Sequence, residues 1–197
     1  MFENFFEYVG IDNKNEINNK KDFIEQYSGC SFLNGIYRIH NVEDIKKWTK
    51  IVEDAFPKYK NNIKVFGYDW LGRQFAENIQ TKTVLMFEPG TGEVLNIPVD
   101  FVKFHDEEIA DYNEDSLASS FFKNWYESSP KQELQHNQCV GYKVPLFLNG
   151  NDDITNLEVS DMEYDGSNDP LIINILLNSR VHMNLNLQYS LFTNLLF

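Results

Sequence analysis

The stretch TVLMFEPGTGEVLNI, residues 83–97, says most about the fold. Two runs rich in apolar side chains, residues 83–87 and 93–97, flank the sequence Pro-Gly-Thr-Gly at positions 89–92. Because glycine accepts the positive φ angles that tight turns need, this spacing predicts two antiparallel strands joined by a hairpin turn. An isolated hairpin is barely stable in water, so a larger antiparallel sheet is expected around it.

Other β-type runs lie on both sides of this hairpin. Strands are expected at residues 35–39, 63–66, 74–79, 143–148 and 157–162. The loop Asn-Gly-Asn-Asp-Asp, residues 149–153, has the composition of a turn and is expected to join the last two.

The clearest helix is predicted at residues 42–56. Ile45, Trp48, Val52 and Phe56 recur at helical spacing, and Pro57 ends the pattern. Shorter helices are expected at 20–27, 106–110 and 116–125. The last has an apolar stripe that is expected to pack in the core, formed by Leu117, Phe121, Phe122 and Trp125.

These elements predict one α+β domain, a mainly antiparallel sheet of five or six strands with helices packed on it. The domain is expected to cover residues 1–168, followed by an atypical tail at 169–197 that is rich in Asn and Leu. Within the tail, apolar and polar residues alternate from 181 to 191, which is typical of a strand. That strand is expected either at a sheet edge, as a pairing surface for an oligomer, or within the core.

The charge of the chain restricts its partners. Seventeen Lys and Arg stand against 30 Asp and Glu, which gives a net charge of -13. Such a surface repels phosphate backbones and anionic lipids, so nucleic acid and membranes are not expected as partners. A protein with a basic surface is expected instead, because opposite fields speed the encounter.

The sequence favours a cytoplasmic location. Cys30 and Cys139 have no metal-ligand spacing, and a domain of this size needs no disulfide, which favours a reducing compartment. The start, MFENFFEYVG, lacks a basic leader, and the apolar run at 171–177 is too short to span a bilayer.

Sequence patterns for a cofactor or metal are incomplete. Gly90 and Gly92 lack the third glycine and the helix of a dinucleotide fingerprint. Asn149, Asn151 and Asp153 alternate as the ligands of a calcium loop do, but its sixth position is Ile154 in place of glycine and its twelfth is Ser160 in place of glutamate. His105 and Glu108 share a helical face but have no third ligand. No cofactor, metal site or catalytic group is therefore predicted.

Five residues are candidates for partner binding. Asp69, Trp70 and Arg73 share a glycine-flanked turn, and Trp and Arg often dominate interfaces. The alternative is that Trp70 covers the core while Asp69 and Arg73 pair within the fold. Glu88 and Glu93 flank the hairpin tip, where they either meet a basic partner or belong to a solvated turn.

Several dense segments resemble a known group of proteins. These segments are GCSFLNGIYRIH at 29–40, FGYDWLGRQF at 66–75, FEPGTGEVLNIP at 87–98, FFKNW at 121–125 and CVGYKVPLFL at 139–148. Together they resemble the bacterial immunity proteins of the type VI secretion Tdi family and, more loosely, the SUKH superfamily. The resemblance implies an α+β fold with a bent sheet, no cofactor, and inhibition of a toxin by direct contact.

Three functional hypotheses follow. The first is a non-catalytic immunity-type protein that neutralises a toxin or effector through an acidic surface. The second is a regulatory or scaffolding subunit of a multiprotein, defence-type assembly, which the apolar tail suggests. The third is a hydrolase that uses Cys30 or Cys139, with His40, His105 or His136 as the base.

Overall fold

The computed structural model describes residues 1–12, 17–88, 91–129, 133–144, 146 and 149–162. The proposed tail at 169–197 and its alternating segment lie outside these residues, as does the predicted end of the domain at 168. In the described part of the chain, no helix has the length and apolar character needed to cross a membrane.

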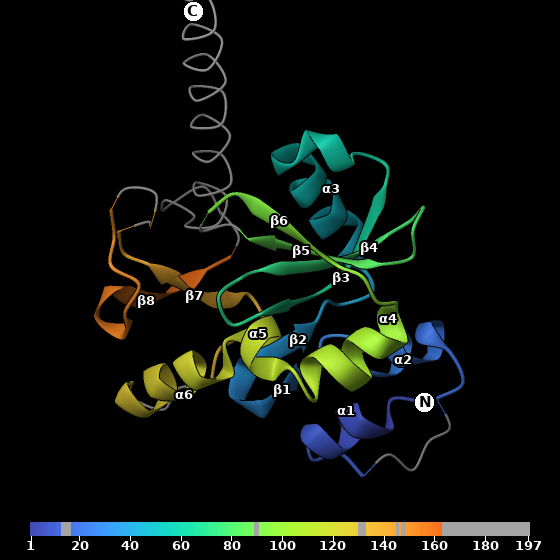
Figure 1. Ribbon diagram of the computed structural model, residues 1–197, viewed down its shortest axis with the longest axis horizontal. Helices are drawn as coiled ribbons and strands as arrows, with labels where there is room; N and C mark the ends of the chain where they lie inside the picture. Colours follow the sequence, from blue (N-terminus) through green and yellow to red (C-terminus); the bar gives the residue numbers. More distant parts are fainter. Residues whose placement is uncertain (13–16, 89–90, 130–132, 145, 147–148, 163–197) are drawn as a thin grey trace, which may run out of the picture.

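A six-stranded antiparallel sheet forms the centre of the molecule (Figure 1). Its strands follow one another in chain order, so each pairs with its sequence neighbour. They are β1 (Ser31–Phe32), β2 (Tyr37–Ile39), β3 (Ile63–Asp69), β4 (Gln74–Asn78), β5 (Val84–Glu88) and β6 (Glu93–Ile97). The predicted α+β class, with six strands and helices packed on the sheet, is confirmed. The hairpin predicted at 83–97 is formed by β5 and β6.

A separate two-stranded sheet pairs β7 (Gln138–Tyr142) with β8 (Leu157–Asp161). Of the predicted strand at 143–148, positions 143, 144 and 146 are described and lie outside any strand, because the strand that pairs with β8 ends at Tyr142. The other three positions lie outside the described residues. Beyond Tyr142, the Asn156 side chain binds the backbone of Val144, accepting from its N–H at 2.9 Å and donating to its carbonyl at 2.8 Å. The Lys143 amide also donates to the Asn156 carbonyl at 2.8 Å, so both backbone and side-chain contacts join the two segments beyond the paired strands.

Arg38 on β2 joins the two sheets. One of its guanidinium nitrogens donates to the carbonyls of Gln135, at 2.9 Å, and Gln138, at 2.6 Å. The Val140 amide also donates to the carbonyl of Trp70 at 2.6 Å. The small sheet is thus tied to the β3–β4 turn.

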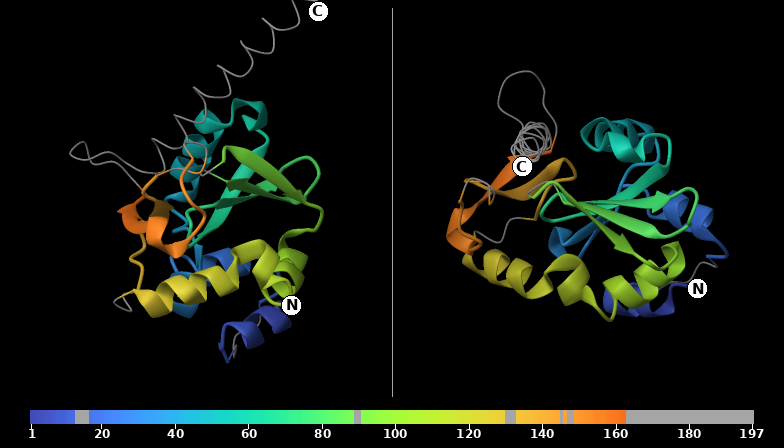
Figure 2. Two further views of the ribbon diagram at one scale, coloured as in Figure 1. Left: turned by 60° about the vertical axis from the view of Figure 1, so that its left-hand side comes forward. Right: turned by 45° about the horizontal axis from the view of Figure 1, so that its top comes forward.

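Helices cover both faces of the large sheet (Figure 2). One face carries α3 (Ile45–Ala55), whose Trp48 and Val52 pack with Val65 and Leu85. The core on the other face includes side chains from α1 (Glu3–Tyr8), α2 (Lys20–Gln26), α4 (Phe101–Lys103), η3 (Phe104–Ile109), α5 (Asn113–Leu117) and α6 (Ser119–Ser128). Successive strand residues face opposite sides, so each strand serves both layers.

The sequence pattern did not predict α1. Its Phe5 and Phe6 are buried, and Phe5 and Phe23 form a ring contact with centroids 5.6 Å apart. The Asp106 side chain accepts hydrogen bonds from the amides of Phe2, at 3.1 Å, and Phe5, at 3.2 Å. A carboxylate at a helix start satisfies donors that would otherwise lack partners.

The helix predicted at 116–125 is divided in two. Ala118 adopts a left-handed conformation, with φ 52° and ψ 52°, and separates α5 from α6. The predicted core packing is nevertheless confirmed, because Leu117, Phe122 and Trp125 are buried. The break changes the path of the helix but keeps its apolar side against the core.

Replacing Ala118 by glycine should raise the free energy of unfolding by about 0.5–1 kcal/mol, because glycine takes a positive φ without the steric cost that a Cβ brings. Urea denaturation measures the change. Ala110→Gly is the matched control, since Ala110 is right-handed (φ -79°) and should lose about 1 kcal/mol. A loss of stability in Ala118→Gly would contradict the strain assigned to this residue.

Candidate functional site

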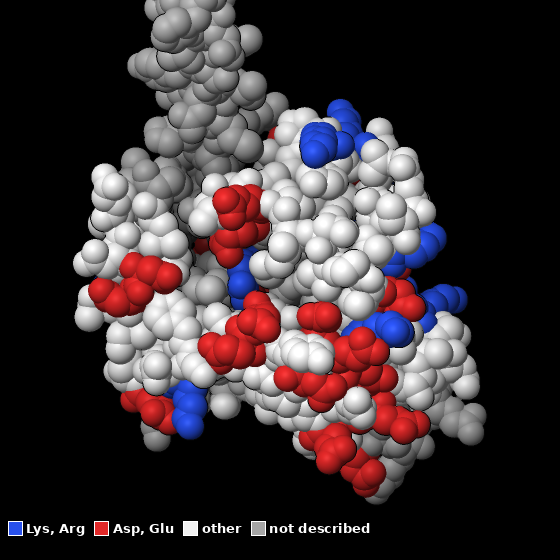
Figure 3. All heavy atoms as spheres, in the orientation of Figure 1, with Lys and Arg blue, Asp and Glu red and all other residues white. Residues whose placement is uncertain are grey.

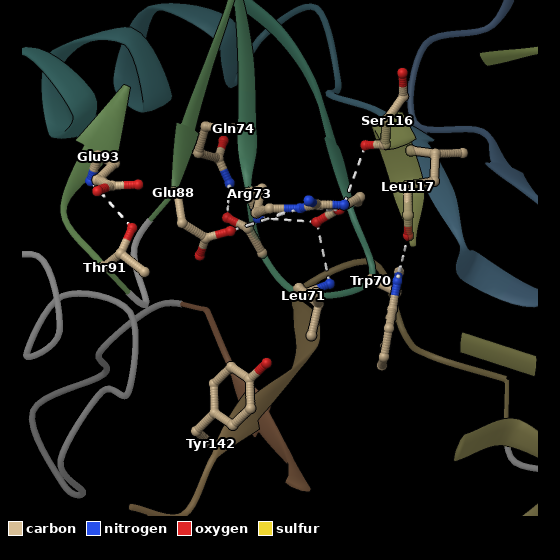
Figure 4. A network of polar contacts seen from close by, with 12 residues as sticks. Trp70, Leu71, Arg73, Gln74, Glu88, Thr91, Glu93, Ser116, Leu117 and Tyr142 are labelled. Carbon is tan, nitrogen blue, oxygen red and sulfur yellow. Dashed lines mark hydrogen bonds and ion pairs between the residues drawn. The ribbon is translucent and has the colours of Figure 1, made fainter. Parts of the chain in front are cut away.

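The turn between β3 and β4 is held together from inside. The Asp69 carboxylate accepts hydrogen bonds from the amides of Leu71, at 3.1 Å, and Arg73, at 2.9 Å, and forms an ion pair with the Arg73 Nε at 2.6 Å (Figure 4). Asp69 is 0% exposed and Arg73 is 7% exposed. Burial raises the pKa of the Asp69 carboxyl, and the Arg73 guanidinium opposes that shift.

The same turn reaches the end of α5. Arg73 donates to the carbonyl of Ser116 at 3.0 Å, and the Trp70 indole N–H donates to the carbonyl of Leu117 at 2.8 Å (Figure 4). Trp70 is 0% exposed and stacks on Trp125 with centroids 5.8 Å apart. The expectation that this cluster presents Asp69, Trp70 and Arg73 to a partner is therefore corrected: the alternative, internal pairing and core packing, describes the structure.

Glu88 and Glu93 stand directly opposite each other on β5 and β6. Two carboxylates in this position repel each other. Glu88 lies 3.8 Å from the Arg73 Nε, which offsets the repulsion, and its side chain is 23% exposed. Glu93 is exposed. Of the five predicted residues, Glu93 is thus the most available to a partner, with Glu88 partly available.

A larger group of carboxylates lies away from the five predicted residues, on the ridge formed by α4, η3 and α5. This acidic face consists of Asp100, Asp106, Glu107, Glu108, Asp111, Glu114 and Asp115. Figure 3 shows Asp and Glu side chains concentrated over these elements, whereas Lys side chains gather over α3 and the nearby margin. The apolar residues between them, including Phe104 and Ile109, are buried. Four of the carboxylates are exposed and three are half-buried; the half-buried ones are Asp106, Glu107 and Glu108.

Part of the acidic face also has a structural role. Asp100 accepts from the amides of Val102 and Lys103, each at 2.9 Å, and so caps α4. Glu114 accepts from the Ser120 amide at 2.9 Å, and these local hydrogen bonds lower its pKa. Asp111 and Asp115 are exposed. The acidic face therefore holds fixed carboxylates beside exposed ones.

The sequence did carry a signal for this face. The run HDEEIADYNED, residues 105–115, is rich in Asp and Glu, but the sequence analysis interpreted it as a short helix with an incomplete metal site, not as an acidic surface. In the structure, the His105 ring is occupied at both nitrogens, at 2.7 Å from the Phe101 carbonyl and 2.9 Å from the Tyr37 hydroxyl. Within the described residues, no group of three or more His, Cys, Asp or Glu could hold a metal ion.

The two thiols have little thiolate character. Burial raises the pKa of Cys139 to about 12 and raises that of Cys30 from its ordinary value. His40 and His105 are buried, and burial lowers the pKa of each to about 3. A thiolate is the nucleophilic form of cysteine, so neither thiol is activated for attack at neutral pH.

Comparisons with known proteins give a fold but no family. No protein-family model matches the sequence, and no match is found among curated proteins. The crystal structure of Atu4351 from Agrobacterium tumefaciens is similar, with a TM-score of 0.58 and 15% sequence identity, over 91% of this chain and 88% of that chain. At this identity the likeness concerns the fold alone. It is compatible with the α+β architecture described above.

Proposed function

We propose that this protein is a non-catalytic inhibitor that neutralises a toxin or effector by direct contact between its acidic face and a basic surface of that partner. The observation that carries the proposal is the concentration of carboxylates on α4, η3 and α5. Lys103 is the one cation between positions 100 and 115. A face of one sign steers an oppositely charged partner and disfavours wrong ones.

Other features support the same proposal. The thiols are held in their protonated forms, which is unfavourable for the hydrolase hypothesis. The motif resemblance to the Tdi immunity proteins points to toxin neutralisation, with no cofactor. Both cysteines are free, which fits action in the reducing cytoplasm.

Neutralising the exposed part of the acidic face should slow binding of the partner. The variant Glu107→Gln/Asp111→Asn/Asp115→Asn removes three carboxylates that cap no helix. We expect its association rate to fall by about tenfold at low salt, with a weaker salt dependence, because charges at an interface rim act mainly on the rate of encounter. The association rate is measured by surface plasmon resonance. The immobilised partner is a candidate toxin, the product of a gene adjacent to the gene of this protein, in a catalytically inactivated form.

The matched control removes the same charge from another surface. Glu127, Glu133 and Glu158 are exposed and lie outside the acidic face, so the triple Glu→Gln variant should keep the wild-type rate within about twofold. Equal slowing in both variants would assign the effect to net charge. An unchanged association rate in the variant of the acidic face would show that this face is not the interface.

A further inference from the structure

A lysine-rimmed groove lies between α2, α3 and the ends of β3 and β4. Its volume is about 1020 Å³, which is the size of a small-molecule site. Six lysines line this groove in a chain whose net charge is -13. They are Lys20, Lys21, Lys46, Lys50, Lys60 and Lys64. The groove therefore has the opposite sign to the molecule as a whole.

The groove also has an apolar lining. Ile24, Ile45 and Ile63 are each less than 7% exposed and contribute to its wall. Val42 and Ile79, which line the same groove, are each 45% exposed. Methylene stems of the lysines extend the apolar surface while their ammonium groups remain in water. The apolar part of a ligand bound in this groove would be removed from water.

The carboxylates of the groove are already engaged. Glu25 lies 3.6 Å from the Lys21 ammonium, and Asp54 lies 2.7 Å from that of Lys50. Glu53 accepts a hydrogen bond from the Asn61 amide at 2.8 Å. These three acids therefore leave part of the lysine charge unbalanced.

Three lysines carry that unbalanced charge. Lys20 pairs with Glu77 at 2.5 Å, and burial lowers its pKa. Lys46, Lys60 and Lys64 are exposed, and no ion pair joins them to any residue that the structure describes. The groove thus offers three available ammonium groups beside apolar walls.

We propose that this groove binds an anionic amphiphile, a small molecule with one negatively charged head group on an aliphatic body. The isoleucine side chains take the aliphatic body, and the available lysines pair with the head group. Both parts are needed, because an exposed ion pair alone contributes little affinity. This inference is independent of the acidic face and of the proposed function.

Titration with decanoate, below the concentration at which it forms micelles, tests the proposal. Chemical shifts of the groove amides should move together along one saturable curve. Lys46→Gln/Lys60→Gln/Lys64→Gln should weaken the affinity by about tenfold, as expected for three modest ion pairs. Lys58→Gln/Lys103→Gln/Lys123→Gln changes the charge equally at exposed positions outside the groove and should bind within about twofold of wild type.

A second arm tests the apolar wall. Ile79→Asn should weaken decanoate binding, whereas Leu95→Asn on β6, which is 54% exposed and outside the groove, should not. The uncharged analogue 1-decanol should bind more weakly than decanoate to wild type and be insensitive to the lysine changes. No saturable shift in the groove, equal losses in the two lysine variants, or equal binding of decanol and decanoate would each overturn the proposal.

Discussion

Asp69→Ala should lower the free energy of unfolding by about 3–5 kcal/mol, because it leaves the Arg73 guanidinium buried without its carboxylate. The Arg73 Nε lies 2.6 Å from Asp69, and the same carboxylate holds two amides of the turn. Glu88, at 3.8 Å from Arg73, compensates only in part. A loss of this size is a large share of the stability of an ordinary domain. Urea denaturation at pH 7 measures it.

A double-mutant cycle separates the pair from its surroundings. Arg73→Leu should be strongly destabilising as well, whereas Asp69→Ala/Arg73→Leu should cost clearly less than the sum of the two single changes. Asp54→Ala is the control for burial, since Asp54 lies 2.7 Å from Lys50 on an exposed surface. Its unfolding midpoint should barely move. Additive losses across the cycle would show that Asp69 and Arg73 do not act as a pair.

The protein should lose about 4 kcal/mol of stability between pH 7 and pH 5, because two neutral imidazoles are buried. Burial lowers the pKa of both His40 and His105 to about 3. The unfolded chain takes up protons near pH 6.5, whereas the folded chain does not. Stability is therefore fully present above pH 6.5 and falls as the pH drops towards 3.

The surroundings of the two rings explain the low pKa values. His40 lies between Trp48 and Tyr68, with ring centroids at 5.1 and 4.5 Å, and hydrogen bonds to Gln74. The His105 Nδ1 must donate to the carbonyl of Phe101, so its Nε2 accepts from a tyrosine hydroxyl. A proton on either ring would add charge in an aromatic environment.

Urea denaturation at several pH values between 7 and 5 checks this prediction. His40→Gln/His105→Gln should start from lower stability at pH 7 but lose almost none of it on acidification. Each single variant should retain about half of the wild-type loss, since the two sites are separate. If the double variant keeps the full dependence on pH, other groups titrate in this window.

The sequence predicted elements whose signals are local. Residues 42–56 were predicted as a helix, and α3 occupies Ile45–Ala55 because its apolar spacing and Pro57 are both contained in one short segment. The hairpin at 83–97 was likewise predicted from its flanking runs and glycines. Boundaries differ by a few residues, as helix ends usually do.

Long-range contacts explain the errors. The amphipathic stripe at 116–125 continues across Ala118, so its spacing predicts one helix. In the structure, the side chains of Trp70 and Arg73 donate hydrogen bonds to the carbonyls of Leu117 and Ser116. In a continuous helix, these carbonyls would accept from amides of the same helix. The partners lie more than 40 residues away in sequence. The burial of Asp69 and Trp70 depends on the same long-range contacts, so it could not be predicted from the local sequence of the turn.

The acidic face and the lysine-rimmed groove separate negative from positive charge within the molecule. Carboxylates are concentrated on α4, η3 and α5, while lysines line the groove beside α3. Separated charge of opposite sign creates an electric dipole moment. A highly charged macromolecule would therefore exert a torque on this protein at a distance and bias its orientation before the two surfaces touch.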